Sequence, residues 1–163
     1  AYIQPEDVCP QRGAGNYVYI SRIDGYCLLV PEELQPEQTF PGRFEGGPVW
    51  MRHPSFGDVK TSLTIGSYGY FPGQTPRQAL ASWLRDASIS EPVDLTVGGY
   101  PAITFNNYRD PWDDNITFVS VDGHLLTILV QPYEPDQWPD GIPFFSAARD
   151  LALSTITFFT PWH

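Results

Sequence analysis

Alternating apolar and polar positions predict a β-hairpin near the start of the chain. The segments 17–23 and 26–30 are rich in aromatic and aliphatic residues, and they flank the dipeptide Asp24-Gly25. Asp-Gly between two apolar runs is a strong local signal for a two-residue turn, because both residues tolerate the positive φ angles that such a turn requires.

A second hairpin is predicted around Asp122-Gly123, between segments 115–121 and 124–133. Both segments carry apolar residues on both faces, including Ile116, Phe118, Val119, Leu125, Leu126, Ile128 and Leu129. An antiparallel sheet with one face in water alternates apolar and polar positions instead. We therefore expect the middle of this sheet to be covered on both sides.

The segment 75–87 predicts a helix that begins with a capping box. Thr75 stands at the N-cap position, Pro76 at the first helical position, and Gln78 three residues after Thr75. Apolar residues follow at helical spacing: Ala79, Leu80, Trp83, Leu84 and Ala87. A second helical stripe is formed by Phe144, Phe145, Ala148, Leu151, Ala152 and Thr155, and extended chain is expected over 156–159.

Shorter apolar runs predict the remaining strands. We expect strands over 49–52 and 61–68, and two short strands or one bent strand over 95–108. The proline- and glycine-rich segment 31–48 is predicted to be a long loop, and residues 1–16 an extended arm.

Two helices and about seven strands in hairpin order predict an antiparallel α+β domain. We expect a sheet of about six or seven strands, covered by two helices and the long loops. Residues 17–163 would form this single domain, preceded by the arm 1–16. A doubly wound parallel fold is disfavoured, because strands outnumber the helices available as crossovers.

The order of these motifs resembles the PsbP-like superfamily of α/β/α sandwiches, which includes exported bacterial lipoproteins. The resemblance covers residues 17–160. It is carried by the step Leu29-Val30-Pro31-Glu32, the strand and capped helix over 61–87, the step Val97-Gly98-Gly99-Tyr100-Pro101-Ala102, and the terminal helix running into Thr155-Ile156-Thr157-Phe158. The chain departs from the Pro-x-Gly-Trp pattern frequent in that family, since it has Pro31-Glu32-Glu33-Leu34, and no functional residue is transferred. The resemblance implies a fold used for binding and assembly rather than catalysis.

Composition excludes several classes of protein. The 163-residue chain carries a net charge of −10, and 15% of its residues are aromatic. An acidic disordered tail would lack such aromatic content, and a nucleic-acid partner would require a basic surface. No apolar run approaches the length of about 20 residues that a membrane-spanning helix needs, so we expect no direct membrane insertion.

Two cysteines, Cys9 and Cys27, predict a disulfide that joins the arm to the first hairpin. The alternative is two unpaired thiols; zinc ligation is disfavoured by the spacing and by the lack of nearby histidines. A disulfide indicates an oxidising compartment, so we expect a periplasmic, cell-surface or secreted protein. The start at Ala1, without Met, is typical of a chain whose signal or anchor has been removed, or of a trimmed one.

Motifs of nucleophilic and phosphate chemistry are absent from the sequence. It contains no Gly-x-Ser-x-Gly, Ser-x-x-Lys, His-Glu-x-x-His or Gly-x-x-x-x-Gly-Lys pattern. The three histidines are far apart, and His124 and His163 are expected to face solvent. We therefore predict no catalytic residues.

Two acidic, tryptophan-containing segments flank the second hairpin. The first holds Asp110, Trp112, Asp113, Asp114 and Asn115, and the second runs from Glu134 to Gly141 with Trp138 in its middle. Because the hairpin returns the chain to the same end of the sheet, we expect the two segments to lie side by side.

Three interpretations of this acidic rim stay open. An aromatic platform of Tyr108, Trp112, Tyr133 and Trp138 with acidic acceptors suits a protein partner or a glycan. The oxygens of Asp110, Asp113, Asp114 and Asn115 could instead hold Ca²⁺, the only cofactor that the pattern favours, although the spacing is not that of an EF-hand. The third interpretation is that these residues merely build turns.

We predict a non-catalytic extracytoplasmic domain that binds through residues 108–115 and 133–141, with the loop 31–48 as a further contact. A calcium-stabilised structural domain is the main alternative. A glycan hydrolase using Asp113 and Asp136 is the least favoured one, because nothing marks either carboxyl as buried.

Overall fold

The computed structural model describes the chain in seven stretches. They are residues 3–22, 24–38, 49–53, 62–85, 88–109, 112–133 and 141–159.

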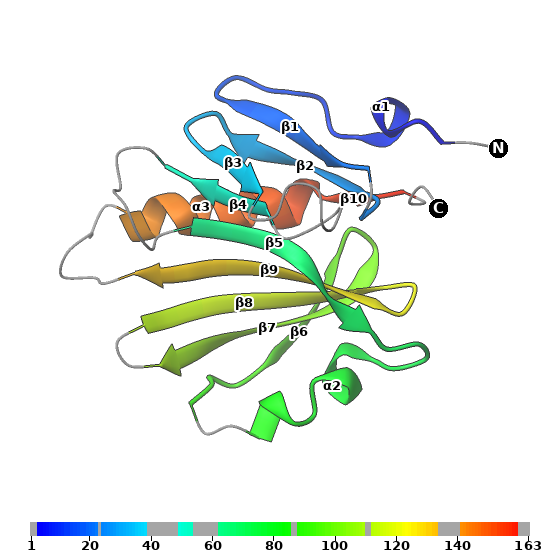
Figure 1. Cartoon of the computed structure of the whole chain (residues 1–163), viewed down its shortest axis with the longest axis vertical. Helices are drawn as coiled ribbons and strands as arrows, with labels where there is room; N and C mark the ends of the chain where they lie inside the picture. Colours follow the sequence, from blue (N-terminus) through cyan, green and yellow to red (C-terminus); the bar gives the residue numbers. More distant parts are fainter. Residues whose placement is uncertain are drawn as a thin grey trace.

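A long antiparallel sheet runs through the molecule; in Figure 1 its strands β5 to β9 fill the lower half, and β3 and β4 lie above them. Within the described ranges it has seven strands, in the order β3-β4-β5-β9-β8-β7-β6. Their bounds are β3 Gln35–Gln38, β4 Val49–Arg52, β5 Ser62–Tyr70, β6 Val93–Val97, β7 Tyr100–Arg109, β8 Trp112–Val121 and β9 His124–Tyr133. The hairpin predicted at Asp122-Gly123 is confirmed: these residues have φ angles of 49° and 88° and join β8 to β9.

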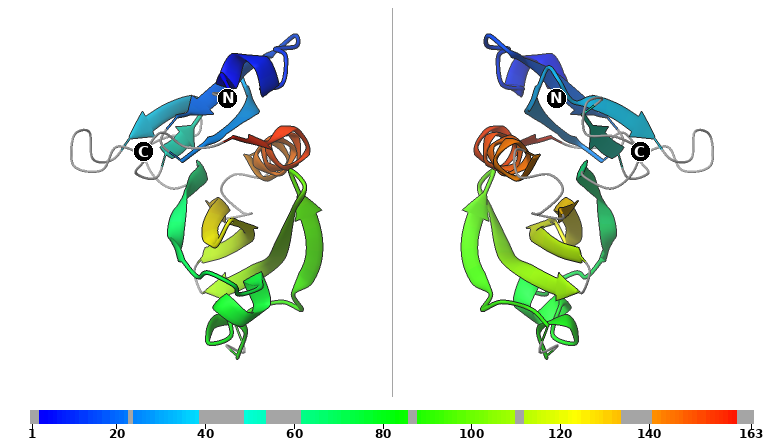
Figure 2. Two further views of the ribbon diagram at one scale, coloured as in Figure 1. Left: turned by 90° about the vertical axis from the view of Figure 1, so that its right-hand side faces the viewer. Right: turned by 90° about the vertical axis from the view of Figure 1, so that its left-hand side faces the viewer.

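The first hairpin belongs to a different sheet. Strands β1 (Asn16–Ser21) and β2 (Tyr26–Pro31) form the predicted hairpin, but β1 ends at Ser21 rather than at residue 23, and the last pair is Ser21 with Tyr26, so the connection is longer than the predicted two-residue turn. Strand β10 (Thr157–Phe158) adds to the other edge of β2. Helix α3 (Gly141–Thr155) lies between this three-stranded sheet and the seven-stranded one, as Figures 1 and 2 show. The antiparallel α+β class is therefore confirmed. The prediction of one sheet covered by two helices was wrong in detail, because the α3 layer carries a second sheet on its outer face.

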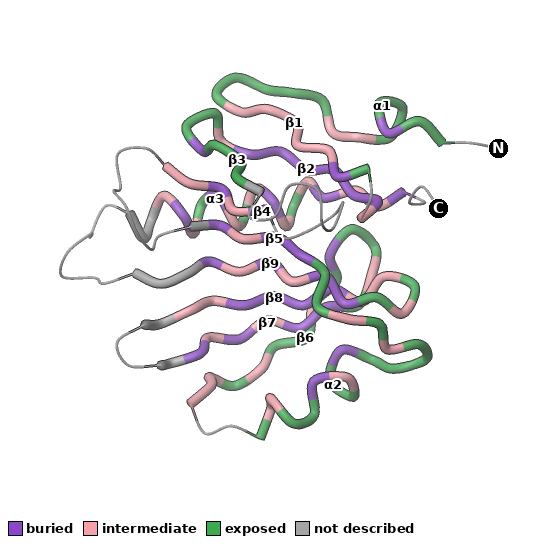
Figure 3. The backbone as a smooth tube through the Cα atoms, in the orientation of Figure 1, coloured by how far each residue is buried: buried purple, intermediate pink, exposed green. Residues whose placement is uncertain are grey.

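Buried side chains form two clusters, one on each face of the seven-stranded sheet. Figure 3 shows that buried residues follow the middle of the strands β5, β7, β8 and β9. The larger cluster joins α3 to both sheets and includes Leu28, Val30, Ile65, Ile128, Phe145 and Ala148. The smaller cluster lies on the opposite face and contains Leu80, Ile103, Phe105, Ile116, Phe118 and Leu125. The apolar residues on both faces of β8 and β9 thus face a core on each side, as the sequence predicted.

The helix predicted over 75–87 is much shorter than expected. Its capping box is present, since the Thr75 side chain accepts from the Gln78 N–H and the Gln78 side chain accepts from the Thr75 N–H. However, α2 spans only Pro76–Ala79, and a short 3-10 helix, η2, follows at Trp83–Arg85. The apolar spacing is satisfied by both turns, because Leu80 and Trp83 each pack on the smaller cluster. Tertiary packing has overridden the helical period here.

The segment 31–48 contains a strand where a loop was predicted. Strand β3 pairs with β4, and Pro36 lies opposite Met51. Proline lacks the N–H that a central strand needs, and it is tolerated here because β3 is at the edge of the sheet.

The N-terminal arm is fastened to the three-stranded sheet. A single helical turn, α1 (Pro5–Val8), interrupts the chain that was predicted to be extended. Cys9 and Cys27 form the predicted disulfide, with their Cα atoms 5.8 Å apart. Glu6 also forms an ion pair with Arg22. In the described part of the chain, no helix combines the length and the apolar character needed to cross a membrane.

Candidate functional site

The described part of the acidic rim predicted from the sequence, residues 108–109, 112–115 and 133, lies at one end of β7, β8 and β9. In the backbone register, Asp113 stands opposite Tyr108 on one side and Tyr133 on the other, and Trp112 pairs with Arg109. Three of the four predicted aromatic positions are therefore at the same end of the sheet. Trp138 and Asp110 fall outside the described residues. Most of 108–115 is strand rather than loop, because β7 and β8 continue to Arg109 and from Trp112.

The predicted calcium ligand Asn115 is engaged in a structural network. Its side-chain amide donates to Asn106 Oδ1 at 2.7 Å, and its Oδ1 accepts from the Arg149 guanidinium on α3. A metal ion at Asn115 would have to share that oxygen with the positively charged Arg149 guanidinium or displace it. Asp113 and Asp114 lie in β8 beside it. The calcium site stays a prediction, now with this competing contact.

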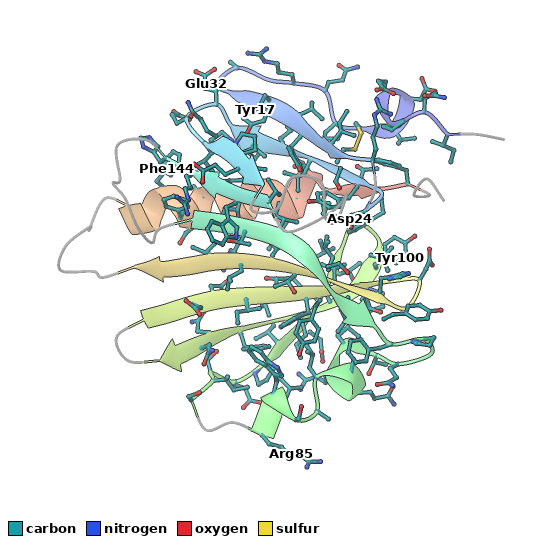
Figure 4. The ribbon with its side chains drawn as sticks, in the orientation of Figure 1. Tyr17, Asp24, Glu32, Arg85, Tyr100 and Phe144 are labelled. Atoms are coloured by element: carbon teal, nitrogen blue, oxygen red, sulfur yellow. A yellow bond between two sulfur atoms is a disulfide. The ribbon has the colours of Figure 1, made fainter. Side chains whose placement is uncertain are left out.

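A cleft of about 690 Å³ lies at the opposite end of the seven-stranded sheet. The β1–β2 turn, the end of β5, the start of β7, the β8–β9 turn and β10 all contribute to its walls. Its polar and aromatic lining includes the side chains of Asp24, Tyr70, Tyr100, Asp122, His124 and Phe158. Figure 4 shows Asp24 and Tyr100 on the same side of the molecule, where the two sheets meet.

Backbone contacts hold the turns around the cleft in place. The Phe159 N–H donates to the Gly25 carbonyl at 2.7 Å, which ties the first Asp-Gly turn to the C-terminal strand. The Phe71 N–H donates to the Gly123 carbonyl at 2.6 Å, which ties the second Asp-Gly turn to the end of β5. The cleft is thus lined by turns with fixed positions, a feature typical of preformed ligand sites.

The carboxyl group of Asp24 is partly removed from water. Burial raises its pKa above the ordinary value of 3.8, against the opposing effects of the Ser21 hydroxyl and of His124. The Ser21 hydroxyl contacts Asp24 Oδ2 at 3.3 Å. The charged carboxylate is therefore less well solvated than it would be on an open surface.

Aromatic rings line other parts of the same cleft. Tyr70 is 61% exposed, and its ring lies 4.6 Å from the imidazole of His124. Tyr100 packs edge-on against Phe158, with ring centroids 5.2 Å apart. The cleft therefore combines apolar and aromatic surface with a few polar groups, a composition common in binding sites.

Sequence reasoning missed this cleft. Both Asp-Gly turns were predicted, but nothing local indicates that turns from two different sheets meet. His124 is exposed, as expected, yet it lines the cleft. Among the residues that the structure describes, no three His, Cys, Asp or Glu side chains are grouped as a metal site requires.

Comparisons with known proteins give one informative result. No protein-family model and no curated protein matches the chain, whereas sixteen chains of solved structures do. One is the solution structure of cyanobacterial PsbP (CyanoP) from Synechocystis sp. PCC 6803, with a TM-score of 0.56 and 16% sequence identity. The match covers 93% of this chain and 97% of that one. The resemblance inferred from the order of motifs is confirmed at the level of structure: the chain has the PsbP-like fold.

Proposed function

We propose that this protein is a non-catalytic, extracytoplasmic binding domain that engages a protein partner through the cleft between its two sheets. The observation that carries the proposal is the half-buried Asp24 carboxylate in a cleft of about 690 Å³ that aromatic side chains also line. The PsbP-like fold supports a role in binding or assembly by analogy only.

The geometry of the cleft favours binding over catalysis. Ser67, His124 and Asp24 all line it, and these are the residue types of a hydrolytic triad. In the described structure no hydrogen bond joins any two of them: Asp24 contacts Ser21, and the ring of His124 lies against Tyr70. In such a triad the serine must hydrogen-bond to the histidine that activates it, and the histidine must hydrogen-bond to the aspartate that orients it.

The disulfide supports the extracytoplasmic part of the proposal. Structural disulfides persist in oxidising compartments and are rare in the cytosol. Here the Cys9–Cys27 bond fastens the arm that brings Ile3 to the wall of the cleft. An oxidising compartment would therefore preserve both the arm and this wall.

The experiment is site-specific photo-crosslinking in cells of the source organism. A photoreactive phenylalanine analogue replaces Tyr70, whose exposed ring stands in the cleft. The matched control places it at Val93, which is 56% exposed on the edge strand β6. We expect a crosslinked protein of discrete mass from position 70 and none from position 93. No adduct at position 70, or the same adduct from both positions, would overturn the proposal.

A further inference from the structure

We propose that the cleft receives a basic side chain of the partner, with its guanidinium or ammonium group against Asp24. This inference rests on the proposed function, because it names the chemistry of the ligand for the same site.

The charge of the cleft favours a cation. Asp24 and Asp122 both line it, and none of its described lining residues is a lysine or an arginine. His124 is the titratable group that could oppose them, and its ring is 4.6 Å from Tyr70. The whole chain carries a net charge of −10, so long-range electrostatics also attracts a basic segment.

The described hydrogen bond to the Asp24 carboxylate is weak, so a charged donor would bind this group more strongly. The described contact to its carboxylate is the Ser21 hydroxyl at 3.3 Å, which is long for an O–H···O hydrogen bond. A guanidinium offers two parallel N–H donors to one carboxylate, and such charge-assisted pairs are roughly twice as strong as neutral hydrogen bonds. A bound cation would also compensate the Asp24 carboxylate for the hydration that it loses on burial.

The aromatic walls suit the rest of an arginine side chain. Tyr70 and Tyr100 come from different strands, and Phe158 packs edge-on against Tyr100. Arginine stacks its flat guanidinium on aromatic faces and lays its methylene stem along apolar surface. The lining is about evenly divided between polar and apolar surface, and such a mixed surface suits the charged head and the methylene stem of one arginine side chain.

The test uses small probes of defined charge and NMR of the oxidised, full-length protein. Capped arginine, capped lysine and capped citrulline are titrated separately into the 15N-labelled protein at neutral pH. Citrulline has nearly the shape of arginine without its charge. We expect arginine to shift the amide signals of Gly25, Tyr100, Gly123 and His124, and to bind at least about tenfold more tightly than citrulline. Stronger shifts with lysine than with arginine would support a cationic ligand but overturn the proposed stacking of a guanidinium group on the aromatic walls.

Matched variants locate the interaction. Asp24→Asn should weaken arginine binding by at least about tenfold, whereas Glu91→Gln, which removes the same charge from an exposed position before β6, should change it by less than about twofold. Tyr70→Leu, at a mostly exposed position, should weaken binding about threefold and serves if Asp24→Asn does not fold.

Three results would overturn this inference: equal binding of arginine and citrulline, arginine binding unaffected by Asp24→Asn, or no shift with either cation. A neutral disaccharide that shifts the same amides and is unaffected by Asp24→Asn would replace the cation with a glycan. Each of these results leaves the crosslinking experiment free to succeed, so failure of the ligand class is distinguishable from failure of the proposed function.

Discussion

Asp24 shows how a residue in a simple turn acquires a special environment. In the sequence it is half of an Asp-Gly turn signal, and in the structure its carboxyl lies where two sheets meet. Because burial raises its pKa above 3.8, the folded protein binds this proton more tightly than the unfolded chain does. The contribution of Asp24 to the free energy of unfolding must therefore fall as the pH rises from the pKa of the unfolded chain through that of the folded protein, and stay lower above it.

Asp24→Asn should consequently stabilise the protein at neutral pH, since asparagine keeps an acceptor for Ser21 without the poorly solvated charge. The gain should disappear once the pH falls below about 3.8. Urea unfolding of both proteins across this pH range measures the difference between their free energies of unfolding. The titration of the other carboxyl groups is common to both proteins and cancels in this difference. A difference that is independent of pH would contradict a raised pKa for Asp24 in the folded protein.

Asn115 is a second residue whose role depends on its surroundings. It links β7 through Asn106 and α3 through Arg149. Asn115→Ala removes one acceptor and one donor at once, so Asn106 Oδ1 loses its donor. Arg149 loses its link to β8 but keeps its contacts with Asp150. We expect a loss of about 1–3 kcal/mol in the free energy of unfolding.

The matched control is Gln74→Ala, which removes an exposed amide from the turn after β5 and should cost less than about 0.5 kcal/mol. Urea denaturation measures both variants. Equal effects would mean that the Asn106–Asn115–Arg149 network contributes no stability.

At the scale of elements, the β6–β7 turn distinguishes two neighbouring glycines. Gly98 and Gly99 have φ angles of 58° and 85°, so any side chain is strained at either position. A Cβ at Gly98 would also lie 2.8 Å from the Phe158 ring and 3.0 Å from the Ile156 carbonyl oxygen, whereas at Gly99 no atom lies within 4 Å. The turn approaches the C-terminal strand closely only at Gly98.

Gly98→Ala should therefore lower the free energy of unfolding by at least about 1 kcal/mol more than Gly99→Ala does. Thermal and urea unfolding of the two variants give this difference directly, since the φ penalty is common to both. Equal destabilisation would show that the seven-stranded sheet and β10 are not in close contact at this turn.

The segment after Thr75 shows which parts of an element are local. The capping box depends on residues three apart and was predicted correctly. The length of the helix was not, because Leu80 and Trp83 must reach the smaller cluster and do so through a turn and η2. A helical apolar period is satisfied by several short turns in succession, so it does not specify where a helix ends.

At the scale of the whole molecule, the disulfide joins segments 18 residues apart. Reduction frees the arm and should lower the free energy of unfolding by about 3 kcal/mol in the chain-entropy model. Urea unfolding with and without reductant measures this loss. The double variant Cys9→Ala/Cys27→Ala is the control, since its stability should not respond to reductant. Unchanged midpoints for the native protein would contradict a stabilising bond.

The acidic rim at the other end of the sheet stays a prediction from the sequence. If the rim is a second contact surface, Trp112→Ala and Trp138→Ala should each weaken binding of the partner identified by crosslinking by about tenfold or more. Tryptophans at protein interfaces commonly contribute that much to binding. The melting temperature should remain nearly unchanged. Retention on immobilised protein and thermal unfolding are measured on the same preparations. A large fall in melting temperature would instead assign the tryptophans to packing.

The sequence by itself determined the local elements and the class of fold. The two hairpins at Asp-Gly, the capping box at Thr75, the C-terminal helix and the Cys9–Cys27 pair are all confirmed. Each depends on the conformational preferences of a few adjacent residues or, for the cysteines, on a simple count. The order of these elements was sufficient to indicate the PsbP-like fold.

The tertiary structure alone decided how these elements meet. It placed the first hairpin in a separate sheet over α3, paired β3 with β4 across segment 39–48, and brought Asp24, Tyr70 and Tyr100 around one cleft. Such contacts join residues that are tens of positions apart, and their free energy comes from burial of both clusters together rather than from any local preference. The physical reason is that a turn residue specifies its own backbone angles but carries no information about which distant turn will face it.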